Sequence, residues 1–416
     1  MNKFAINILC LAFVLHTTCK AQETELQPMQ ESPFQFTFIP PFSTNGIKNS
    51  KMINKVSINL LVGNSGGIDG FETGCILNTV NHDVKGFQLS GFGNIVSNSL
   101  QGCQLSGFMN ITGNSISAFQ GSGFINLTGS DMKGSQIAGF INVTGGITSG
   151  FQGAGFVNIT GSLAGAQVAG FCNIAGETRK DVQPSETSNT ARTGPANAQF
   201  AGFFNIGSDI NGIQVSGFLN KAGRVKGVQV AGFLNICDSI EGIPVGFINM
   251  VKKNGYRRLE FSVSEVKYAN ISYKMGVRKL YNIYSFGKPT GPGSRWMYGF
   301  GLGTEIDLAD GMLLNLEAEA NQELWLADAV TGTILNSDRL NMVNQVRANF
   351  GWKLQERTVL FIGPSFNVSV SDSRTDEGLR SWYHVAPSWT VYNHYSANQQ
   401  HTNVSMWFGI NGGIRF

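Results

Sequence analysis

The chain has 416 residues and a net charge of +3, and only 14% of its residues are charged. So small a positive charge gives no indication of nucleic-acid binding, and a hydrophobic share of 42% excludes a wholly disordered chain. The length predicts two or three domains, and the 52 glycines predict an unusual number of turns.

The first 21 residues are typical of a secretory signal peptide. Lys3 supplies the positive start, Phe4 to Leu15 the apolar segment, and Ala21 the small residue before the cleavage point. The apolar segment is too short to span a membrane as a helix. Lipidation at Cys19 is an alternative, and both routes predict export. The cysteines of the mature chain show neither metal-ligand spacing nor a disulfide framework: Cys75, Cys103, Cys172 and Cys237.

Residues 22–55 are predicted to be a leader that ends in a first strand. The segment from Phe34 to Phe42 alternates apolar and polar residues and is ended by prolines. Val56 to Val62 is predicted to be a second strand. Gly70 to Lys85 follows as an irregular first repeat that carries Asn78, and irregular terminal units commonly cap solenoids.

Residues 56–255 form a glycine-rich domain that repeats every 15 or 16 residues. A Gly-Phe dipeptide recurs with this period, and an asparagine stands two residues after the phenylalanine. A fixed period of this kind marks a repeat architecture, and the short runs of Val, Ile, Phe and Thr between glycines favour strands. The columns of the repeat contain Gly91, Phe92, Asn94, Gly107, Asn110, Gly123, Asn126, Gly139, Asn142, Gly155 and Asn158.

We predict that each repeat is one coil of a β-solenoid, with three short faces and glycines near the corners. Stacking would bury two apolar columns as a continuous core. The first column follows the asparagine: Ile95, Ile111, Leu127, Val143, Ile159, Ile174 and Ile206. The second column lies in the third segment: Leu100, Ile116, Met132, Ile147, Leu163, Ile210, Val225 and Ile240.

Three further columns are predicted to form ladders along the stack. They consist of the phenylalanines, the asparagines and the glutamines Gln88, Gln104, Gln120, Gln136, Gln152 and Gln167. Stacked amide side chains bond to one another along such a ladder. We interpret these columns as structural and not as ligand contacts.

Residues 177–197 interrupt the repeat with a polar segment rich in Thr, Ser and Pro, which predicts a solvated insertion loop. Insertions in repeat proteins often lie on the binding face. A tolerated loop without a ligand explains the same composition.

Residues 256–416 change to long strands with strict alternation, which predicts an outer-membrane-type β-barrel. Soluble strands are normally about half as long. Eight strands are predicted near 257–264, 265–275, 278–287, 294–308, 311–327, 338–354, 357–371 and 403–416. Eight strands enclose room for side chains only. We therefore expect a filled lumen in which inward acids meet inward bases: Glu305, Glu317, Glu319 and Glu323 with Arg347, Lys353 and Arg415.

Asp372 to Thr402 form the longest predicted loop of this half. Its candidate ligand contacts are the aromatic residues Trp382, Tyr383, Trp389 and Tyr392, because exposed aromatic side chains are frequent at binding sites. An aromatic girdle at the membrane interface is the alternative. The histidines of this loop match no known metal site, and we predict no metal, no cofactor and no catalytic residue.

The unit Gly-x-Gln-x-x-Gly-Phe-x-Asn, seen from Gly134 to Asn142 and from Gly227 to Asn235, resembles the bacterial surface-repeat proteins of spirochaetes and the Bacteroides group. The resemblance covers residues 56–250. It implies an exported, envelope-associated protein and supplies no functional residues to transfer. The aromatic strand that ends at Phe416 is similar to the assembly signal of outer-membrane barrels, which implies a bacterium with two membranes.

The sequence thus predicts an all-β protein, a repeat β-solenoid followed by a C-terminal antiparallel barrel of about eight strands. We expect a non-enzymatic outer-membrane or cell-surface protein for surface display, adhesion or envelope organisation. Expected partners are outer-membrane lipid and the barrel-assembly machinery, with glycans or host and cell-surface proteins as further candidates, and no nucleic acid.

Two alternatives remain. In the first, each repeat is one antiparallel strand of a single large barrel with a channel or transport function, although equal connections on both sides of the repeats count against it. The second is a carbohydrate-active enzyme on a solenoid, which needs paired carboxylates. Residues 86–176 contain a single carboxylate side chain, that of Asp131. Which side of the membrane the repeats occupy is left open.

Overall fold

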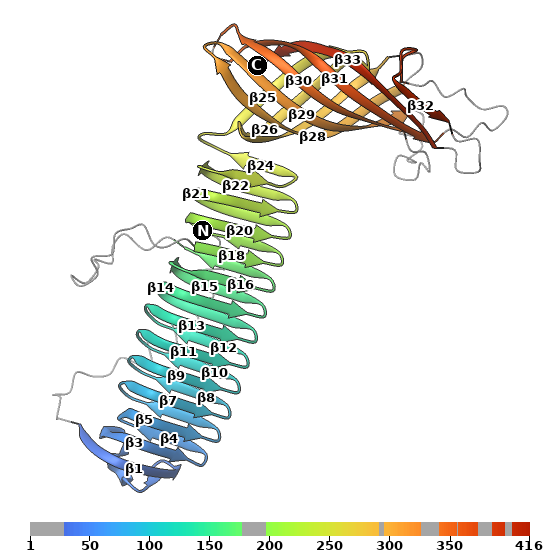
Figure 1. Ribbon diagram of the computed structural model, residues 1–416. Helices are drawn as coiled ribbons and strands as arrows, with labels where there is room; N and C mark the ends of the chain where they lie inside the picture. Colours follow the sequence, from blue (N-terminus) through green and yellow to red (C-terminus); the bar gives the residue numbers. More distant parts are fainter. Residues whose placement is uncertain are drawn as a thin grey trace. The chain divides into compact units, whose positions relative to one another are not determined.

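The computed structural model describes residues 29–176, 197–290, 295–325, 341–355, 357–372, 385–395 and 402–416. It confirms the predicted fold class, because strands make up 76% of it, arranged as a β-solenoid of about 11 turns and a closed antiparallel eight-stranded barrel (Figure 1). The chain divides into two compact units, residues 1–227 and 228–416. No helix in the described ranges is long and apolar enough to cross a membrane. The predicted signal peptide (1–21) and residues 177–196 of the insertion loop lie outside the described residues.

The solenoid consists of short strands joined by tight corners, with one 3-10 helix, η1 (Gly46–Lys51), near its start. Its strands in the first half are β1 (Gln30–Ile39), β2 (Phe42–Ser43), β3 (Met52–Asn59), β4 (Val62–Ser65), β5 (Gly67–Gly74), β6 (Leu77–Val80), β7 (Val84–Ser90), β8 (Gly93–Val96), β9 (Leu100–Ser106), β10 (Met109–Thr112), β11 (Ile116–Ser122), β12 (Ile125–Thr128) and β13 (Met132–Ala138). The later strands are β14 (Ile141–Ala154), β15 (Val157–Leu163), β16 (Ala166–Ala169), β17 (Cys172–Ala175), β18 (Asn197–Ala201), β19 (Phe204–Ile206), β20 (Asp209–Ser216), β21 (Leu219–Ala231), β22 (Leu234–Ile240), β23 (Ile243–Val245) and β24 (Ile248–Val251).

Neighbouring coils pair in parallel, and equivalent residues of successive repeats lie side by side. Asn110 of β10 pairs with Asn94 of β8 and with Asn126 of β12. In the longer strands, Gln104 of β9 pairs with Gln120 of β11. The interpretation of the repeats as antiparallel strands of one large barrel is therefore wrong. Two predicted boundaries are wrong. The parallel ladder begins before residue 56, because β1 already pairs with β3. Asn197, which was predicted to end the insertion loop, is the first residue of β18.

The longer strand of a coil changes direction at a glycine. In β9 both Leu100 and Gln104 are buried, while Gln101 and Gly102 between them are exposed, so the normal alternation of a strand is broken. Gly102 has φ of +120°, a conformation that favours glycine. The bend divides the strand into two faces, and the shorter strand supplies the third, as predicted.

The interior of the solenoid combines one apolar column with columns of polar side chains. The predicted column of Leu100, Ile116 and Met132 is buried and packs with Val84 and Val96, although at Ile147 the neighbouring Thr148 takes the inward position. The other predicted core column, which follows the asparagine, is wrong. Its members from Ile95 to Ile206 are half-buried on the outer side, and the asparagines point inward instead.

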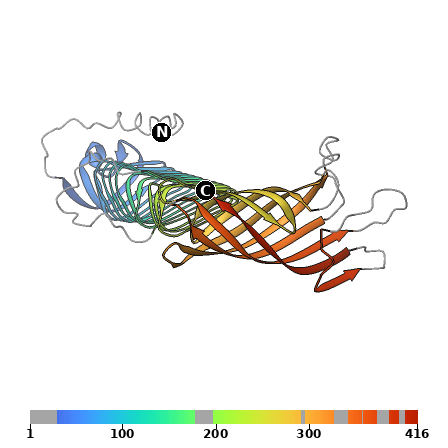
Figure 2. The ribbon, with the colours of Figure 1, turned by 90° about the horizontal axis from the view of Figure 1, so that it is seen from above.

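The barrel contains eight antiparallel strands, and a ninth short strand, β32, lies beside the last of them. The strands are β25 (Tyr256–Ser264), β26 (Lys267–Val277), β27 (Leu280–Pro289), β28 (Arg295–Ala309), β29 (Met312–Trp325), β30 (Asn341–Lys353), β31 (Val359–Asp372), β32 (Tyr392–Tyr395) and β33 (Thr402–Arg415). The barrel closes where β25 pairs with β33, for example at Glu260 beside Arg415. Figure 2 shows the barrel strands, coloured from yellow to red, in a second view. All eight strands lie within a few residues of their predicted positions.

The two faces of the barrel strands have opposite character. Outward side chains are large, apolar and exposed: Leu259, Phe261, Ile271, Tyr273, Tyr298, Phe300, Leu302, Ile306, Leu316, Phe350, Trp352, Leu360, Ile362, Phe408 and Ile410. Inward side chains are mostly polar or charged and buried, such as Glu317, Arg347 and Asn411. The predicted division of faces along β28, β29 and β33 is confirmed.

Candidate functional site

The glycines of the Gly-Phe column are required by the closeness of the stacked coils. A Cβ atom added to Gly123 would lie 2.1 Å from the carbonyl oxygen of Gly107, and one added to Gly139 would lie 2.0 Å from that of Gly123. Gly91, Gly107 and Gly155 meet the preceding coil in the same way. These predicted column residues therefore set the spacing of the stack and present no side chain to a ligand.

The asparagine column is an internal hydrogen-bond ladder. Asn110 donates from Nδ2 to Asn126 Oδ1 at 3.0 Å, and also to the carbonyl oxygen of Gly121 at 2.7 Å. The same contact between asparagines repeats at 2.9–3.0 Å from Asn59 through Asn220. The amides along this column are almost completely buried. Because these amides are hydrogen-bonded to one another and to backbone carbonyl oxygens, the column has no polar group left to bind a ligand.

The glutamine column runs in the opposite sense and ends on a carboxylate. Each glutamine donates from Nε2 to the Oε1 of the glutamine one coil earlier, at 2.6–2.9 Å from Gln214 back to Gln88. Gln88 then donates to Glu72 at 2.7 Å. Glu72 is fully buried and also accepts hydrogen bonds from Asn59 and Ser65. Burial raises the pKa of the Glu72 carboxyl, and these donors oppose the increase.

The phenylalanine column forms a stack of rings on the outside of the solenoid. We call the rings of the first unit the aromatic face: Phe92, Phe108, Phe124, Phe140, Phe156, Phe171, Phe203 and Phe218. Successive centroids lie 4.8–5.2 Å apart with interplanar angles of 1–10°. The ring faces cover one another, so the edges point to the surroundings. Phe108 and Phe124 are each 39% exposed.

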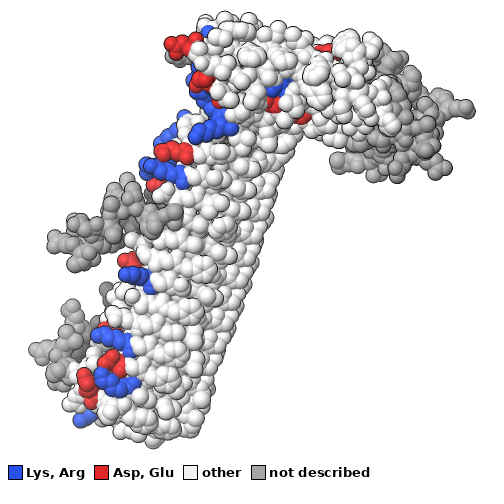
Figure 3. All heavy atoms as spheres, in the orientation of Figure 1, with Lys and Arg blue, Asp and Glu red and all other residues white. Residues whose placement is uncertain are grey.

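Charged side chains of the solenoid are confined to one corner of the coil. Among the described residues from Gly67 to Val251, every Lys, Arg, Asp and Glu except Glu72 and Lys221 lies between the end of the shorter strand and the position of the bend glycine. Lys85 and Lys133 are examples, and Asp209 pairs with Arg224 of the next coil at 3.0 Å. Figure 3 shows these charges along one edge of the solenoid and an uncharged surface beside them.

The lumen of the barrel is filled by an ion-pair network. Lys274 contacts both Glu260 and Glu317, and Arg347 contacts Glu317 and Glu319. The other buried pairs are Lys267 with Glu319 at 2.9 Å, Arg295 with Glu323 at 2.8 Å and Arg415 with Glu260 at 2.6 Å.

The predicted contacts of Glu317 and Glu319 with Arg347 are confirmed, whereas Lys353 is wrong as a lumen residue. It is partly exposed and pairs with Asp307 at 3.2 Å. Sequence reasoning did not assign Lys267, Lys274 and Arg295 to the network. Lys274 follows the outward Tyr273, so the alternation of the strand already indicated that it points inward. For Lys267 the alternation is interrupted by a register shift between Lys267 and Ala269, and its inward direction could not be predicted from the sequence.

The predicted ligand-contact loop is described only in part. Trp382 and Tyr383 lie outside the described residues, whereas Trp389 and Tyr392 are exposed. Tyr392 begins β32, which pairs with β33 at Met406, and the indole Nε1 of Trp389 donates to the carbonyl oxygen of Phe408 at 3.4 Å. The prediction of a continuous loop is therefore wrong here, because this segment extends the edge of β33 beyond the point where β25 ends.

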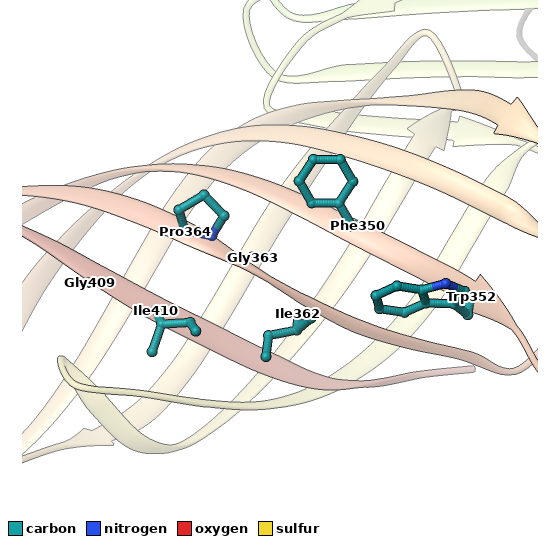
Figure 4. A pocket seen from close by; sticks show the side chains of 7 residues that line it. All are labelled: Phe350, Trp352, Ile362, Gly363, Pro364, Gly409 and Ile410. Carbon is teal, nitrogen blue, oxygen red and sulfur yellow. The ribbon is translucent and has the colours of Figure 1, made fainter.

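A groove of about 360 Å³ lies on the outer wall of the barrel (Figure 4). It is lined by Phe350, Trp352, Ile362, Gly363, Pro364, Gly409 and Ile410. Pro364 has no N–H, and the pairing of β30 with β31 is interrupted beside it. Every lining residue is apolar, so the groove is part of the outward apolar surface and holds no group for acid–base or metal chemistry.

The last coil of the solenoid is capped by the side wall of the barrel. Asn249 donates to Asn282 Oδ1 of β27 at 2.7 Å, so Asn282 supplies the next rung of the ladder. Asn282 in turn donates to the carbonyl oxygens of Gly246 at 2.7 Å and Phe247 at 2.9 Å. The Phe247 ring stacks on Phe300, with centroids 5.3 Å apart. The signal for this junction was a single asparagine on the outward side of β27, beside Tyr284 and Phe286.

Within the described ranges, no cluster of three or more His, Cys, Asp and Glu side chains is placed to hold a metal ion. Comparison with protein-family models, with curated proteins and with solved structures found no match to this chain.

Proposed function

We propose that this protein is a non-enzymatic outer-membrane protein, in which the barrel anchors the solenoid within the cell envelope. The observation that carries the proposal is the inverted polarity of the barrel. Its outward side chains are apolar and aromatic, as at Phe300, Leu302 and Ile306, while ionised side chains such as Glu317 and Arg347 lie inside. A soluble barrel has the opposite arrangement, whereas a barrel that spans an outer membrane requires this one.

The connections between the barrel strands support a periplasmic position for the solenoid. At one end, β26 joins β27 through residues 278–279, and β28 joins β29 through residues 310–311. The two longest connections lie at the other end, residues 326–340 between β29 and β30 and residues 373–391 between β31 and β32. Outer-membrane barrels have short periplasmic turns and longer extracellular loops. The solenoid enters β25 through residues 252–255 at the short-turn end.

This placement favours envelope organisation over display or adhesion. The solenoid has about 11 coils, stacked at roughly 4.8 Å per coil. The amides of its asparagine ladder are bonded to one another, and the exposed carboxylates among the described residues from Gly67 to Val251 lie at the charged corner. Such a stack of coils suits a scaffold at the outer membrane, without a chemical reaction of its own.

Thiol labelling on intact cells tests the anchor and the orientation together. Cys75 in the solenoid is exposed, and Val391, at the long-loop end of the barrel, is 69% exposed. We expect a membrane-impermeant maleimide to label a Val391→Cys, Cys75→Ser variant on intact cells, and to label the native Cys75 only after the outer membrane is permeabilised. Labelling of Cys75 on intact cells would place the solenoid on the surface. Release of the chain by alkaline carbonate would refute the membrane anchor.

Conductance in planar bilayers separates this proposal from a transport function. The ion-paired lumen leaves no reason to expect a wide aqueous path, so we expect no porin-like steps. Stable porin-like conductance of the purified full chain would favour the channel.

A further inference from the structure

We propose that the aromatic face of the solenoid binds the lipid leaflet around the barrel, through contact with its acyl chains. The inference rests on the proposed membrane location of the barrel and extends it to a second lipid-binding surface.

The aromatic face belongs to a wider apolar surface. Beside the ring stack, the column after the glutamine is also apolar and exposed at Leu89, Ile137, Val168 and Phe200. The half-buried column after the asparagine, such as Ile111 and Leu127, lies on the other side of the phenylalanines. Soluble proteins rarely expose contiguous apolar surfaces that extend over many strands, and such a surface marks an interaction site.

The distribution of charge favours lipid over a charged partner. Apart from Lys221, the exposed charges of the described coils lie at the corner that carries Lys85 and Lys133. The solenoid is therefore amphipathic in cross-section, with a charged corner and an apolar side, as are elements that lie in a membrane interface. The geometry of the stack counts against a glycan, because the rings of Phe124 and Phe140 are within 5° of parallel at 4.9 Å. A ring inside the stack, such as Phe124 or Phe140, therefore has both faces covered by its neighbours and presents only its edge to a sugar.

Phenylalanines of the same repeat column that belong to the second unit meet the outward face of the barrel. In the second unit, Phe233 stacks on Phe247 at 5.9 Å, and Phe247 stacks on Phe300 of β28 at 5.3 Å. Phe300 lies in the outward row that continues to Leu302 and Ile306, all of them exposed. Lipid that covers this row therefore reaches Phe247, which is itself 45% exposed. Within the second unit the repeat column and the outward face of the barrel thus share one apolar surface, which favours lipid over a second protein as the occupant of this column.

Photocrosslinking in vesicles tests the inference. The full chain is reconstituted into phosphatidylethanolamine–phosphatidylglycerol vesicles that contain a radiolabelled phospholipid. p-Benzoylphenylalanine replaces Phe140 on the aromatic face, Lys133 at the charged corner of the same coil, or Phe350 on the barrel wall. We expect at least tenfold more lipid adduct at position 140 than at position 133, together with a strong adduct at position 350.

The position 350 variant distinguishes the two levels of the argument. An adduct at 350 with none at 140, equal adducts at 140 and 133, or a protein–protein adduct at 140 would overturn the inference and leave the barrel in the membrane. Absence of the adduct at 350 would refute the membrane location itself, and with it the lipid contact of the solenoid.

Discussion

Replacing one asparagine inside the ladder tests whether buried amides hold the solenoid together. Asn126 donates to Asn142 Oδ1 at 2.9 Å and to the carbonyl oxygen of Ile137 at 2.9 Å, and it accepts from Asn110 at 3.0 Å. Asn126→Ala removes all three hydrogen bonds and takes away the donor to Asn142 Oδ1, an acceptor that is completely buried. With each bond contributing about 1 kcal/mol, the free energy of local opening should fall by about 3 kcal/mol.

Hydrogen exchange measured by mass spectrometry on the full chain can detect this change coil by coil. A loss of about 3 kcal/mol corresponds to roughly 100-fold faster exchange of the amides in β10, β12 and β14, if they exchange through local opening. Ser117→Ala changes an exposed side chain of the adjacent coil and serves as the control, with an expected effect below about 0.5 kcal/mol. Equal exchange in the Asn126→Ala and Ser117→Ala proteins would refute the view that the ladder stabilises the stack.

Three further predictions concern the stack. Gly123→Ala should disrupt the adjacent coils, because its Cβ would lie 2.1 Å from a backbone carbonyl oxygen. The control Gly121→Ala should be tolerated, because its Cβ would meet the side chains of Leu105 and Phe119. Equal protease resistance of the two variant solenoids would contradict the steric argument. Burial raises the pKa of Glu72 in the folded state above its pKa in the unfolded state. At pH values between these two pKa values the folded state binds more protons, so the stability of the first coils should fall as the pH rises from the lower pKa to the higher one. Glu72→Gln should remove that pH dependence, as measured by exchange in β3, β5 and β7; an unchanged pH profile would contradict it. Burial raises the pKa of the Cys172 and Cys237 thiols to about 11. In the purified folded protein at pH 8 these thiols should therefore react with a disulfide reagent far more slowly than the exposed Cys75. Similar reaction rates would indicate that these coils are open.

The opposite senses of the two ladders give the solenoid interior a defined polarity. Asparagine amides donate toward the C-terminal coils and glutamine amides donate toward the N-terminal coils, as the contacts of Asn110 and Gln120 illustrate. Each ladder ends on an acceptor that matches its direction, Glu72 for the glutamines and, in the second unit, Asn282 for Asn249. These end groups satisfy amides that would otherwise be buried without partners, which costs about 1–3 kcal/mol each.

The sequence by itself determined the period, the strand positions and the two faces of the barrel. Identical residues 15 or 16 positions apart can stack only if each repeat is one coil, and strict alternation such as that from Trp296 to Leu308 fixes which residues share a face. The expectation that apolar residues lie inside was wrong, however, at two positions of the repeat: the asparagine points inward, and the apolar residue after it lies on the outer side. Strand geometry places Asn110 and Ile111 on opposite sides and does not say which side is the interior.

Only the tertiary structure decided that question, because the buried amides are stable only when every coil above and below supplies a partner. The same holds for the junction with the barrel, where Asn282 completes a ladder that begins in a different part of the chain. It holds also for the lumen, where Lys274 finds Glu260 and Glu317 only after the strands close into a barrel. Periodicity is a local property that one repeat already displays, whereas the partners of a buried polar group lie on other coils and strands.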